Sequence, residues 1–468
     1  MNALWTSAEA TAATGGRSTM KWRASGVSID TRTLAKGDLF VALQGDARDG
    51  QAFVADAFEK GAAAALVSRH PKEANDNVPL LVVKDTLAGL VALGRASRAR
   101  ANAKIAAVTG SAGKTTTKEM LRLVLGASGA TFASAASYNN HWGVPLSLAR
   151  MPKDTDFAVF EIGMNHEGEI RELVAQVRPQ VALVTTVAPA HLEYFGTVEK
   201  IADAKAEIFE GVEKGGAALI PGDNAHAERL ADHARVSGVE RVLFFGESKA
   251  CVGRLVSVEP CDEGMTVDAE IAGTRHRFAV GAPGRHIATN AVAALLAASE
   301  LGADVARGAA ALSSFAALKG RGARAFLPVE GGSIEMIDES YNANPASMAA
   351  AIGLLGAARP AKGGRRLAVL GDMLELGPEG SALHRGLAIA LEEARADLVF
   401  ACGPQMAALW DAVPPARRGA YASQSVELAE AVARAVRPGD VVLIKGSFGS
   451  RMATIVDALK ARGGATVA

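Results

Sequence analysis

The sequence predicts an α/β protein built from three domains, and three observations support this prediction. The chain has 468 residues, which at roughly 100–200 residues per domain allows two to four domains. Its residues are 49% hydrophobic and 21% charged, so each domain can bury a core. Short apolar runs alternate with helical stretches along most of the chain, and this alternation is typical of mostly parallel sheets.

The first domain, residues 1–100, is expected to be a small α/β unit. Apolar runs at 38–43, 62–67 and 80–83 predict short strands. A helix is expected over 87–100, and its basic end suits the negative pole of the helix dipole. Because this helix leads out of the unit, we place the first boundary near residue 100.

The second domain, residues 101–322, is expected to hold a mostly parallel sheet that begins with an apolar strand at 104–109. The other expected strands are residues 157–162, 181–187 and 217–220. Residues 252–280 differ, because charges and Gly turns interrupt their short apolar runs. This segment predicts an antiparallel appendage on the same domain.

The third domain, residues 323–468, is expected to be a Rossmann-like α/β unit. The expected strands are residues 334–337, 367–370, 398–401 and 441–444. Three of them end in polar turns that contain Gly, at 371–372, 402–403 and 445–447. Open α/β sheets bind ligands beyond the carboxyl ends of their strands, so these turns are candidate ligand contacts.

The composition excludes several classes of protein. Fifty basic and fifty acidic residues cancel, which argues against a nucleic-acid-binding protein. No run of about 18 uncharged apolar residues occurs, so we expect no integral membrane segment, and the first residues show no signal peptide. Three cysteines without C-x-x-C spacing fit a reducing cytoplasm better than a disulfide framework or a zinc site.

The strongest chemical signal is T-G-S-A-G-K-T-T-T, which follows an apolar strand and opens a helix. In such a loop, backbone N–H groups, a helix N-terminus and a lysine converge on phosphate oxygens. We expect Lys114 to hold the β- and γ-phosphates and the Thr115 hydroxyl to bind Mg²⁺. Val108 stands where the general pattern has its first Gly, so an ordinary Gly turn that caps a helix is the alternative. The residues expected to contact the nucleotide are Thr109, Gly110, Ser111, Ala112, Gly113, Lys114, Thr115 and Thr116.

Two polar residues follow the next strands of the second domain. Glu161 ends the strand at 157–162, and its carboxylate could coordinate Mg²⁺ opposite the phosphate loop. His191 follows the strand at 181–187, which could bring both side chains to one edge of the sheet. Taken alone, the Glu is more often a solvated residue at a strand end, and the His is more often structural.

Several segments, taken in order, resemble one enzyme family. They are T-G-S-A-G-K-T-T-T, E-I-G-M-N, A-P-A-H-L-E-Y-F-G, A-K-A-E-I-F and G-R-H-I-A-T-N-A. Together they resemble the Mur ligases of peptidoglycan synthesis over nearly the whole chain, and the P-loop of that family lacks the same first Gly. The resemblance implies ATP-driven amide formation with ATP and Mg²⁺. It also implies a UDP-binding first domain, an ATP-binding P-loop domain and a third domain that closes over the site.

Two segments of the third domain narrow the resemblance to one group of members within the family. D-E-S-Y-N-A-N-P at 338–345 and L-G-D-M-L-E-L-G at 370–377 resemble the members that join D-alanyl-D-alanine to a UDP-N-acetylmuramoyl-tripeptide. The D-N-P-R segment typical of the diaminopimelate-adding members is absent. The resemblance implies these two substrates and a cytoplasmic enzyme, and we expect a monomer. The third residue of the tripeptide stays open.

The resemblance also implies the metal ligands. Thr115 and Glu161 would hold one Mg²⁺, and His191 would hold a second. Lys205, in A-K-A-E-I-F, matches a lysine that is commonly carbamylated in the family and then resembles a carboxylate ligand. Its residue type alone indicates a solvated helix residue instead.

The remaining nucleotide contacts follow from the same resemblance. Asn290 matches the asparagine at the adenine, Arg324 the arginine near the γ-phosphate and Glu339 the acidic residue at the ribose. Arg321 and Asp338 are rivals for the last two roles, because a shift of a few residues would exchange them.

The segments expected to bind the UDP-linked substrate lie in the first two domains. Ser28, Thr31 and Arg32 resemble the uridine-nucleotide site, although a polar turn before a strand is the simpler interpretation of these residues alone. Gln51 stands where the family usually has His. Asn139 and Asn140 resemble the pair that holds the muramoyl-peptide, and the adjacent His141 is expected to pack or to face solvent.

Two other functions stay open at this point. One is a sister enzyme on the same scaffold, either another Mur ligase or a folate or polyglutamate ligase, which acceptor-dependent phosphate release would distinguish. The other is a P-loop protein that is not a ligase, such as a nucleotide-dependent switch, which would hydrolyse slowly without an acceptor and respond to a protein partner.

Overall fold

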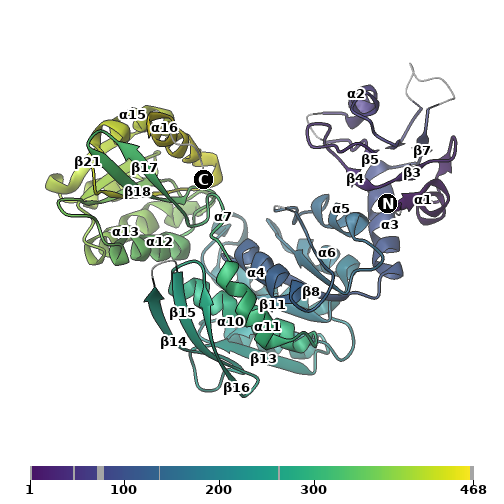
Figure 1. The fold of residues 1–468 in the computed structure, drawn as a ribbon, viewed down its shortest axis with the longest axis horizontal. Coiled ribbons are helices and arrows are strands. Elements are labelled where there is room, and N and C mark those ends of the chain that lie inside the picture. Colours follow the sequence, from purple (N-terminus) through teal and green to yellow (C-terminus); the bar gives the residue numbers. More distant parts are fainter. Residues whose placement is uncertain (1–2, 46–47, 71–77, 136, 262–263, 464–468) are drawn as a thin grey trace.

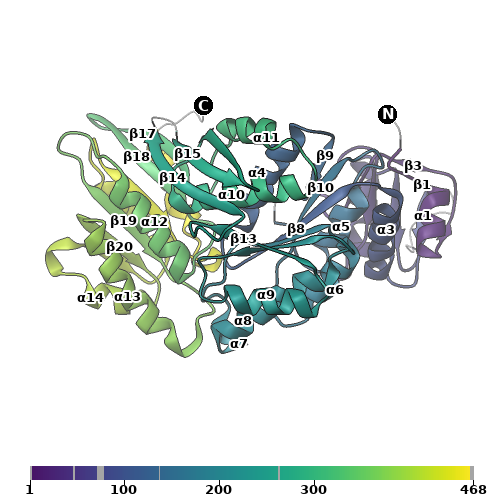
Figure 2. The ribbon, with the colours of Figure 1, turned by 90° about the horizontal axis from the view of Figure 1, so that it is seen from below.

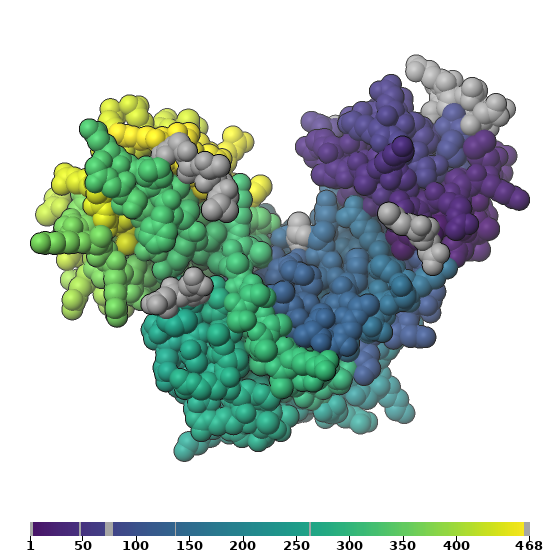
Figure 3. All heavy atoms as spheres, viewed as in Figure 1, coloured from purple at the N-terminus to yellow at the C-terminus, as the bar shows by residue number. Residues whose placement is uncertain are grey.

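The computed structural model describes residues 3–45, 48–70, 78–135, 137–261 and 264–463. Three α/β domains follow one another along the chain (Figure 1). We call them the N-terminal domain (to residue 100), the central domain (104–315) and the C-terminal domain (323–463). The N-terminal and C-terminal domains stand apart at the two ends of the central domain, and the space-filling view is hollowed between them (Figure 3). The predicted three-domain α/β fold with a mostly parallel central sheet is confirmed.

The N-terminal domain is built on a five-stranded sheet of order β2-β7-β6-β5-β4. Its strands are β2 (Arg17–Ser18), β4 (Gly26–Ser28), β5 (Asp38–Val41), β6 (Ala64–Val67) and β7 (Leu80–Val82). Only β2 pairs antiparallel within this sheet, and β1 (Trp5–Thr6) pairs separately with β3 (Arg23–Ala24). The helices are α1 (Ser7–Thr14), α2 (Val54–Glu59) and α3 (Thr86–Arg100). Helix α3 therefore ends where the first boundary was expected.

The central domain holds a nine-stranded sheet of order β16-β15-β14-β13-β12-β11-β8-β10-β9. Its parallel strands are β8 (Lys104–Thr109), β9 (Thr131–Ala133), β10 (Phe157–Glu161), β11 (Val181–Val184), β12 (Ala217–Pro221) and β13 (Arg241–Gly246). The last three are β14 (Gly253–Cys261), β15 (Gly264–Ile271) and β16 (Thr274–Val280). Strand β14 joins the sheet parallel to β13, whereas β15 and β16 are antiparallel. The antiparallel appendage expected over 252–280 thus continues the sheet.

Alternate residues of β8 pack into two different cores on the two faces of the central sheet. Ala106 and Val108 face α4 (Lys114–Gly126), α10 (Arg285–Glu300) and α11 (Val305–Ala311), whereas Ile105 and Ala107 face the other layer. Figure 2 shows the two helical layers on opposite sides of the strands. The other layer contains α5 (Gly143–Arg150), α6 (Glu169–Val177), α7 (Leu192–Phe195), α8 (Val198–Ala206) and α9 (Ala227–Val236). Because β8 is buried on both faces, the loop after it is held rigidly.

The C-terminal domain has a six-stranded sheet of order β17-β18-β22-β19-β20-β21. Its strands are β17 (Ala323–Val329), β18 (Gly332–Glu339), β19 (Arg366–Gly371), β20 (Leu398–Cys402), β21 (Arg418–Ala422) and β22 (Val441–Lys445). Only β17 is antiparallel, and the predicted strands omitted both β17 and β21. The helices are α12 (Pro345–Ala357), α13 (Gly380–Glu393), α14 (Ala407–Ala412), α15 (Ser425–Ala435) and α16 (Ala453–Gly463).

Helix α3 ties the N-terminal domain to the central domain. It packs along α5, and the buried guanidinium of Arg98 donates to the carbonyl oxygens of Val177 at 2.8 Å and Arg178 at 2.9 Å. These carbonyls end α6, where the helix dipole favours a cation. Among the described residues, no helix combines the length and the apolar character needed to cross a bilayer.

Candidate active site

The loop between β8 and α4 has the shape of a phosphate cradle. Gly110 and Gly113 have φ of +148° and +80°, a region that favours glycine. A Cβ at Gly110 would lie 1.8 Å from Oγ1 of Thr185, so no larger residue fits there. Gly113 precedes α4 without any side-chain cap. The first backbone N–H groups of the helix are therefore available to an anionic ligand. The local geometry therefore favours a phosphate loop over a simple capping turn.

Lys114, at the start of α4, folds its side chain back over this loop. Its ammonium donates to the Gly110 carbonyl at 2.6 Å. Burial lowers the pKa of Lys114, and the nearby carboxylate of Glu161 opposes that shift. A phosphate at the loop would favour the charged form in the same way. Lys114 is thus positioned to bind an anionic group.

Glu161 is a buried carboxylate, 1% exposed, beside the same loop. Thr115 donates its hydroxyl to one carboxylate oxygen at 2.9 Å, and Asn139 donates its amide to the other at 2.7 Å. Hydroxyl and carboxylate oxygens are the ligands that Mg²⁺ prefers, and a Mg²⁺ at substrate phosphates needs only one or two of them from the protein. The residues present therefore fit a Mg²⁺ bound together with phosphate. In the described part of the chain, no cluster of three or more His, Cys, Asp or Glu side chains forms an all-protein metal cage.

His191 lies on the turn that leads from β11 into α7, in the left-handed region at φ 60°. Its Nδ1 lies 2.5 Å from a carboxylate oxygen of Glu375, which belongs to the C-terminal domain. Burial lowers the pKa of His191, and Glu375 opposes this shift. The ring therefore has one nitrogen engaged by a carboxylate, and His191 lines the cavity described below.

Lys205 sits at the end of α8 and is 2% exposed, so its interpretation as a solvated helix residue is wrong. Burial lowers the pKa of Lys205 well below its usual value, and the charge of Lys114 adds to the effect. Within the described residues, its ammonium makes no ion pair. Burial therefore favours the neutral amine over the ammonium at this position.

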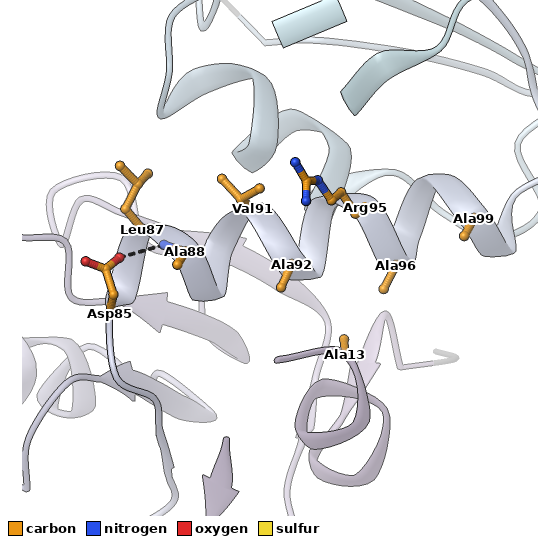
Figure 4. Close-up of a pocket in the computed structure, with 9 residues that line it drawn as sticks. All are labelled: Ala13, Asp85, Leu87, Ala88, Val91, Ala92, Arg95, Ala96 and Ala99. Carbon is orange, nitrogen blue, oxygen red and sulfur yellow. Dashed lines mark hydrogen bonds between the residues drawn. The ribbon is translucent and has the colours of Figure 1, made fainter. Parts of the chain in front are cut away.

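A cavity of about 670 Å³ lies where the central and C-terminal domains meet. It brings together many of the residues expected at the nucleotide and metal sites, namely Ser111, Ala112, Gly113, Lys114, Thr116, Glu161, His191, Asn290 and Glu339. It is also lined by Asn139 and Asn140, which were expected to hold the muramoyl-peptide. Its polar groups converge from both domains, as expected for a ligand site. A second cavity, of about 810 Å³, follows the outer face of α3 and is lined mostly by alanines (Figure 4). It brings no such set of polar groups together.

The structure brings Arg321, and not Arg324, to the cavity. Arg321 stacks 4.0 Å from the ring centre of Tyr341 and donates to Ser137 Oγ at 3.3 Å. Arg324 lies on β17, where it pairs with Glu335 at 2.8 Å. The physical reason is that the antiparallel pairing of β17 with β18 fixes Arg324 on the strand, whereas Arg321 precedes it.

The two rival carboxylates of β18 are also separated. Glu339 lines the cavity and accepts from the buried ammonium of Lys445 at 3.1 Å. Asp338 is 2% exposed and accepts from the Gly320 and Ser340 amides instead. The carboxylate of Asp338 is therefore used by backbone amides beside β17 and β18, whereas the carboxylate of Glu339 lies at the cavity and is available to a ligand.

The residues expected at the uridine site lie in the N-terminal domain, apart from this cavity. Ser28 is buried and donates to the Asp30 carbonyl at 3.0 Å, and Thr31 is also buried. Arg32 is 83% exposed in its side chain and pairs with Asp30 at 2.6 Å. Asn140 in the central domain accepts from the Gly143 amide at 3.0 Å, which gives it a role at the start of α5.

Models of one family match the chain in three segments. The Mur ligase family catalytic domain matches residues 23–112, the Mur ligase middle domain 108–298 and the Mur ligase glutamate ligase domain 326–448. A UDP-N-acetylmuramoyl-tripeptide–D-alanyl-D-alanine ligase of Rickettsia prowazekii is 32% identical over 454 residues, covering 97% of this chain and 99% of the relative.

The chain belongs to the Mur ligase family.

Solved Mur ligases share this fold over nearly their whole length. A crystal structure of MurF from Acinetobacter baumannii superposes with a TM-score of 0.84 at 29% identity, covering 98% of this chain and 99% of that one. MurF ligase from Thermotoga maritima, solved in complex with ADP, superposes with a TM-score of 0.77 at 25% identity, covering 94% of this chain and 98% of that one.

Several residues of this Mur ligase reach the site without having been expected there. His286, Tyr341, Asn344 and Lys445 line the cavity, and Glu375 contacts His191. Lys445 carried a signal, because it ends β22 and opens the polar turn at 445–447 that was a candidate ligand contact. Asn344 donates its side-chain amide to the Ser111 carbonyl at 3.0 Å across 233 residues of sequence, and no local pattern reveals such a contact.

Proposed function

We propose that this chain is an ATP-dependent ligase that joins D-alanyl-D-alanine to a UDP-N-acetylmuramoyl-tripeptide during synthesis of peptidoglycan precursors. The observation that carries this proposal is the full-length similarity to a ligase of that name, combined with a phosphate loop that faces the C-terminal domain across one cavity. The P-loop switch is less favoured, because the relatives match all three domains and not the P-loop domain alone.

The chemistry begins at the phosphate loop. The terminal carboxylate of the tripeptide attacks the γ-phosphorus of ATP, which gives an acyl phosphate and ADP. The amine of D-alanyl-D-alanine then attacks the acyl carbon, and the tetrahedral intermediate expels phosphate. Lys114 and the amides at the start of α4 stabilise the charge on the phosphoryl oxygens. When bound, Mg²⁺ would supply further charge neutralisation there, with Thr115 and Glu161 as ligands of one ion and His191 as a ligand of a second.

The C-terminal domain completes the ATP site. Glu339 holds the ribose and Asn290 of α10 holds the adenine, the roles that the family resemblance implies, and both residues line the cavity. Arg321 takes the role at the γ-phosphate that the sequence assigned to Arg324, since only Arg321 lines the cavity. Closure of the C-terminal domain over the cavity would exclude water and so protect an acyl phosphate from hydrolysis.

Lys205 acts as a carbamate. Burial favours the neutral amine, which can add CO₂, and the product is an anion that neighbouring cations stabilise. The burial of Lys205 and the nearby charge of Lys114 support this role. A solvated lysine would stay protonated and would repel a metal ion.

The N-terminal domain binds the UDP end of the substrate. Ser28, Thr31 and Arg32 contact the uridine nucleotide, and Asn139 and Asn140 contact the muramoyl-peptide where it reaches the cavity. Arg32 is exposed and can turn from Asp30 to a pyrophosphate. The enzyme acts as a monomer in the cytoplasm, where its nucleotide substrates are made.

Phosphate release from ATP tests this function. The rate is measured with UDP-N-acetylmuramoyl-tripeptide, with and without D-alanyl-D-alanine. We expect sustained release only when both are present, together with one new amide product by mass spectrometry. Release that needs another acceptor would show a sister ligase, and slow release that ignores every acceptor would show a switch.

A further inference from the structure

His191 and Glu375 meet across the boundary between the central and C-terminal domains. Nδ1 of the imidazole lies 2.5 Å from a carboxylate oxygen, across 184 residues of sequence. Both residues have left-handed backbones, with φ of 60° and 61°. The Glu193 amide also donates to the Glu375 carbonyl at 3.0 Å. Backbone and side chain of Glu375 therefore both hold the turn that carries His191.

This contact belongs to a wider docking of the C-terminal domain on the phosphate loop. Asn344 reaches the Ser111 carbonyl at 3.0 Å. Gly377 lies beside Glu193, because a Cβ there would come within van der Waals contact, 3.4 Å, of the Glu193 Cα. The Glu375 contact is thus one part of a continuous interface beside the cavity.

A carboxylate on one ring nitrogen determines what the other nitrogen can do. A histidine that binds a metal through one nitrogen almost always donates its other N–H to a carboxylate, carbonyl or water, which fixes the tautomer and the ring orientation. With Nδ1–H donated to Glu375, Nε2 carries the free lone pair and is the nitrogen left for a cation.

We propose that Glu375 is a positioning residue for His191, so that the C-terminal domain completes the site of the second divalent cation. This inference rests on the metal-binding role proposed above for His191. Docking of the C-terminal domain would then set the affinity of that cation, and the cation bound by Thr115 and Glu161 would not depend on Glu375.

The test measures Mn²⁺ binding by electron paramagnetic resonance to the full chain with a non-hydrolysable ATP analogue. We expect two Mn²⁺ ions in the unchanged protein. In Glu375→Ala the weaker-bound ion should lose roughly 10–100-fold in affinity, while the other ion is unchanged. Glu375→Gln keeps an acceptor for Nδ1–H but not the charge, so its loss should be intermediate.

Two controls separate the possible outcomes. Glu379→Gln removes an exposed carboxylate four residues away and should bind both ions normally, and equal melting temperatures exclude misfolding. If His191→Ala keeps both ions, the proposed metal role of His191 is wrong. If His191→Ala loses one ion while Glu375→Ala loses none, or if Glu375→Ala weakens both ions equally, the inference about Glu375 is overturned. A single ion in the unchanged protein would also overturn it.

Discussion

The cavity proposed to bind ATP and the segment proposed to bind uridine are built in opposite ways. In and around the cavity, Glu161 and Lys205 are buried and Lys114 is half-buried with its ammonium bound to the Gly110 carbonyl, so all three are held before any ligand arrives. At the uridine segment, Arg32 is largely exposed and its charge is satisfied by a neighbour two residues away. Preorganised groups lower the barrier of the chemical step, whereas exposed groups that reorient on binding mainly affect affinity. The two ends of the substrate path should therefore differ in the kinetic constant that a mutation changes.

The largest effect is expected at the phosphate loop. Lys114→Ala should lower kcat by roughly 10³-fold, because it removes a cation directed at the reacting phosphoryl group. Binding of the UDP-linked substrate should stay within about threefold, since that site lies in another domain. Steady-state phosphate release and calorimetry measure the two effects. An equal loss of kcat and of binding of the UDP-linked substrate would contradict the proposed difference between the two sites.

Lys205 gives a second test of the difference between the two sites, because burial alone does not show a catalytic role. Lys205→Ala should lose roughly 10²-fold in activity and recover part of it with formate or acetate, which can fill the carboxylate position. Lys205→Arg should stay inactive, because arginine keeps the charge and cannot form a carbamate. Full activity in Lys205→Arg would show that the lysine only fills space.

Two arginines three residues apart form a matched pair for the next test. Arg321→Ala should lower kcat/KM for ATP by roughly tenfold or more, because Arg321 lines the cavity. Arg324→Ala removes only an ion pair with Glu335 and should change activity by less than about threefold. The reverse order would mean that the C-terminal domain turns further during turnover and brings Arg324 inward.

A mutation in the exposed segment proposed to bind uridine should change KM and not kcat. Arg32→Ala should raise KM for the UDP-linked substrate by about tenfold and leave kcat nearly unchanged, since a bidentate contact to phosphate is lost only in binding. Asp30→Asn serves as the control, because it frees Arg32 and should not raise KM. A drop in kcat without a change in KM for Arg32→Ala would place Arg32 in the chemistry.

The smallest effect concerns the junction of the N-terminal and central domains. A hydrogen bond and ion pair with Lys153 lower the pKa of Glu9 from 4.5 to about 2. A lowered pKa stabilises the folded state above pH 4.5, and this stabilisation disappears as the pH falls towards 2. Glu9→Gln should therefore cost about 0.5 kcal/mol at pH 7 and nothing at pH 2, as measured by urea unfolding. A cost that is equal at both pH values would exclude the ion pair as its source.

The sequence predicted best what is local. The phosphate loop and most buried strands were found because strand, Gly turn and helix follow one another within a few residues, as at 104–117. Strands β17 and β21 were missed because they lie at the sheet edges and their residues alternate between partly buried and exposed. Such strands lack the continuous apolar run of β22.

The contacts between domains could not be predicted in the same way. Nothing near Glu375 indicates that it meets His191, and nothing near Arg321 indicates that it stacks on Tyr341. These contacts depend on how two folded domains dock, which the spacing of residues along the chain does not encode. Family resemblance located Lys205, but only its burial removes the solvated alternative.

The insertion of Arg98 at the end of α6 has a mechanical consequence. Helix α3 is continuous from the N-terminal sheet to this anchor, so we expect the N-terminal and central domains to move as one body. Among the residues that the structure describes, no comparable helix joins the central and C-terminal sheets, which are linked through residues around Gly320 and Gly322, at φ of 73° and 96°. Fluorophores on the N-terminal and central domains should then keep a constant separation through turnover, while a fluorophore on the C-terminal domain changes its distance from both. Of the three domains, the C-terminal domain is therefore the one that we expect to move.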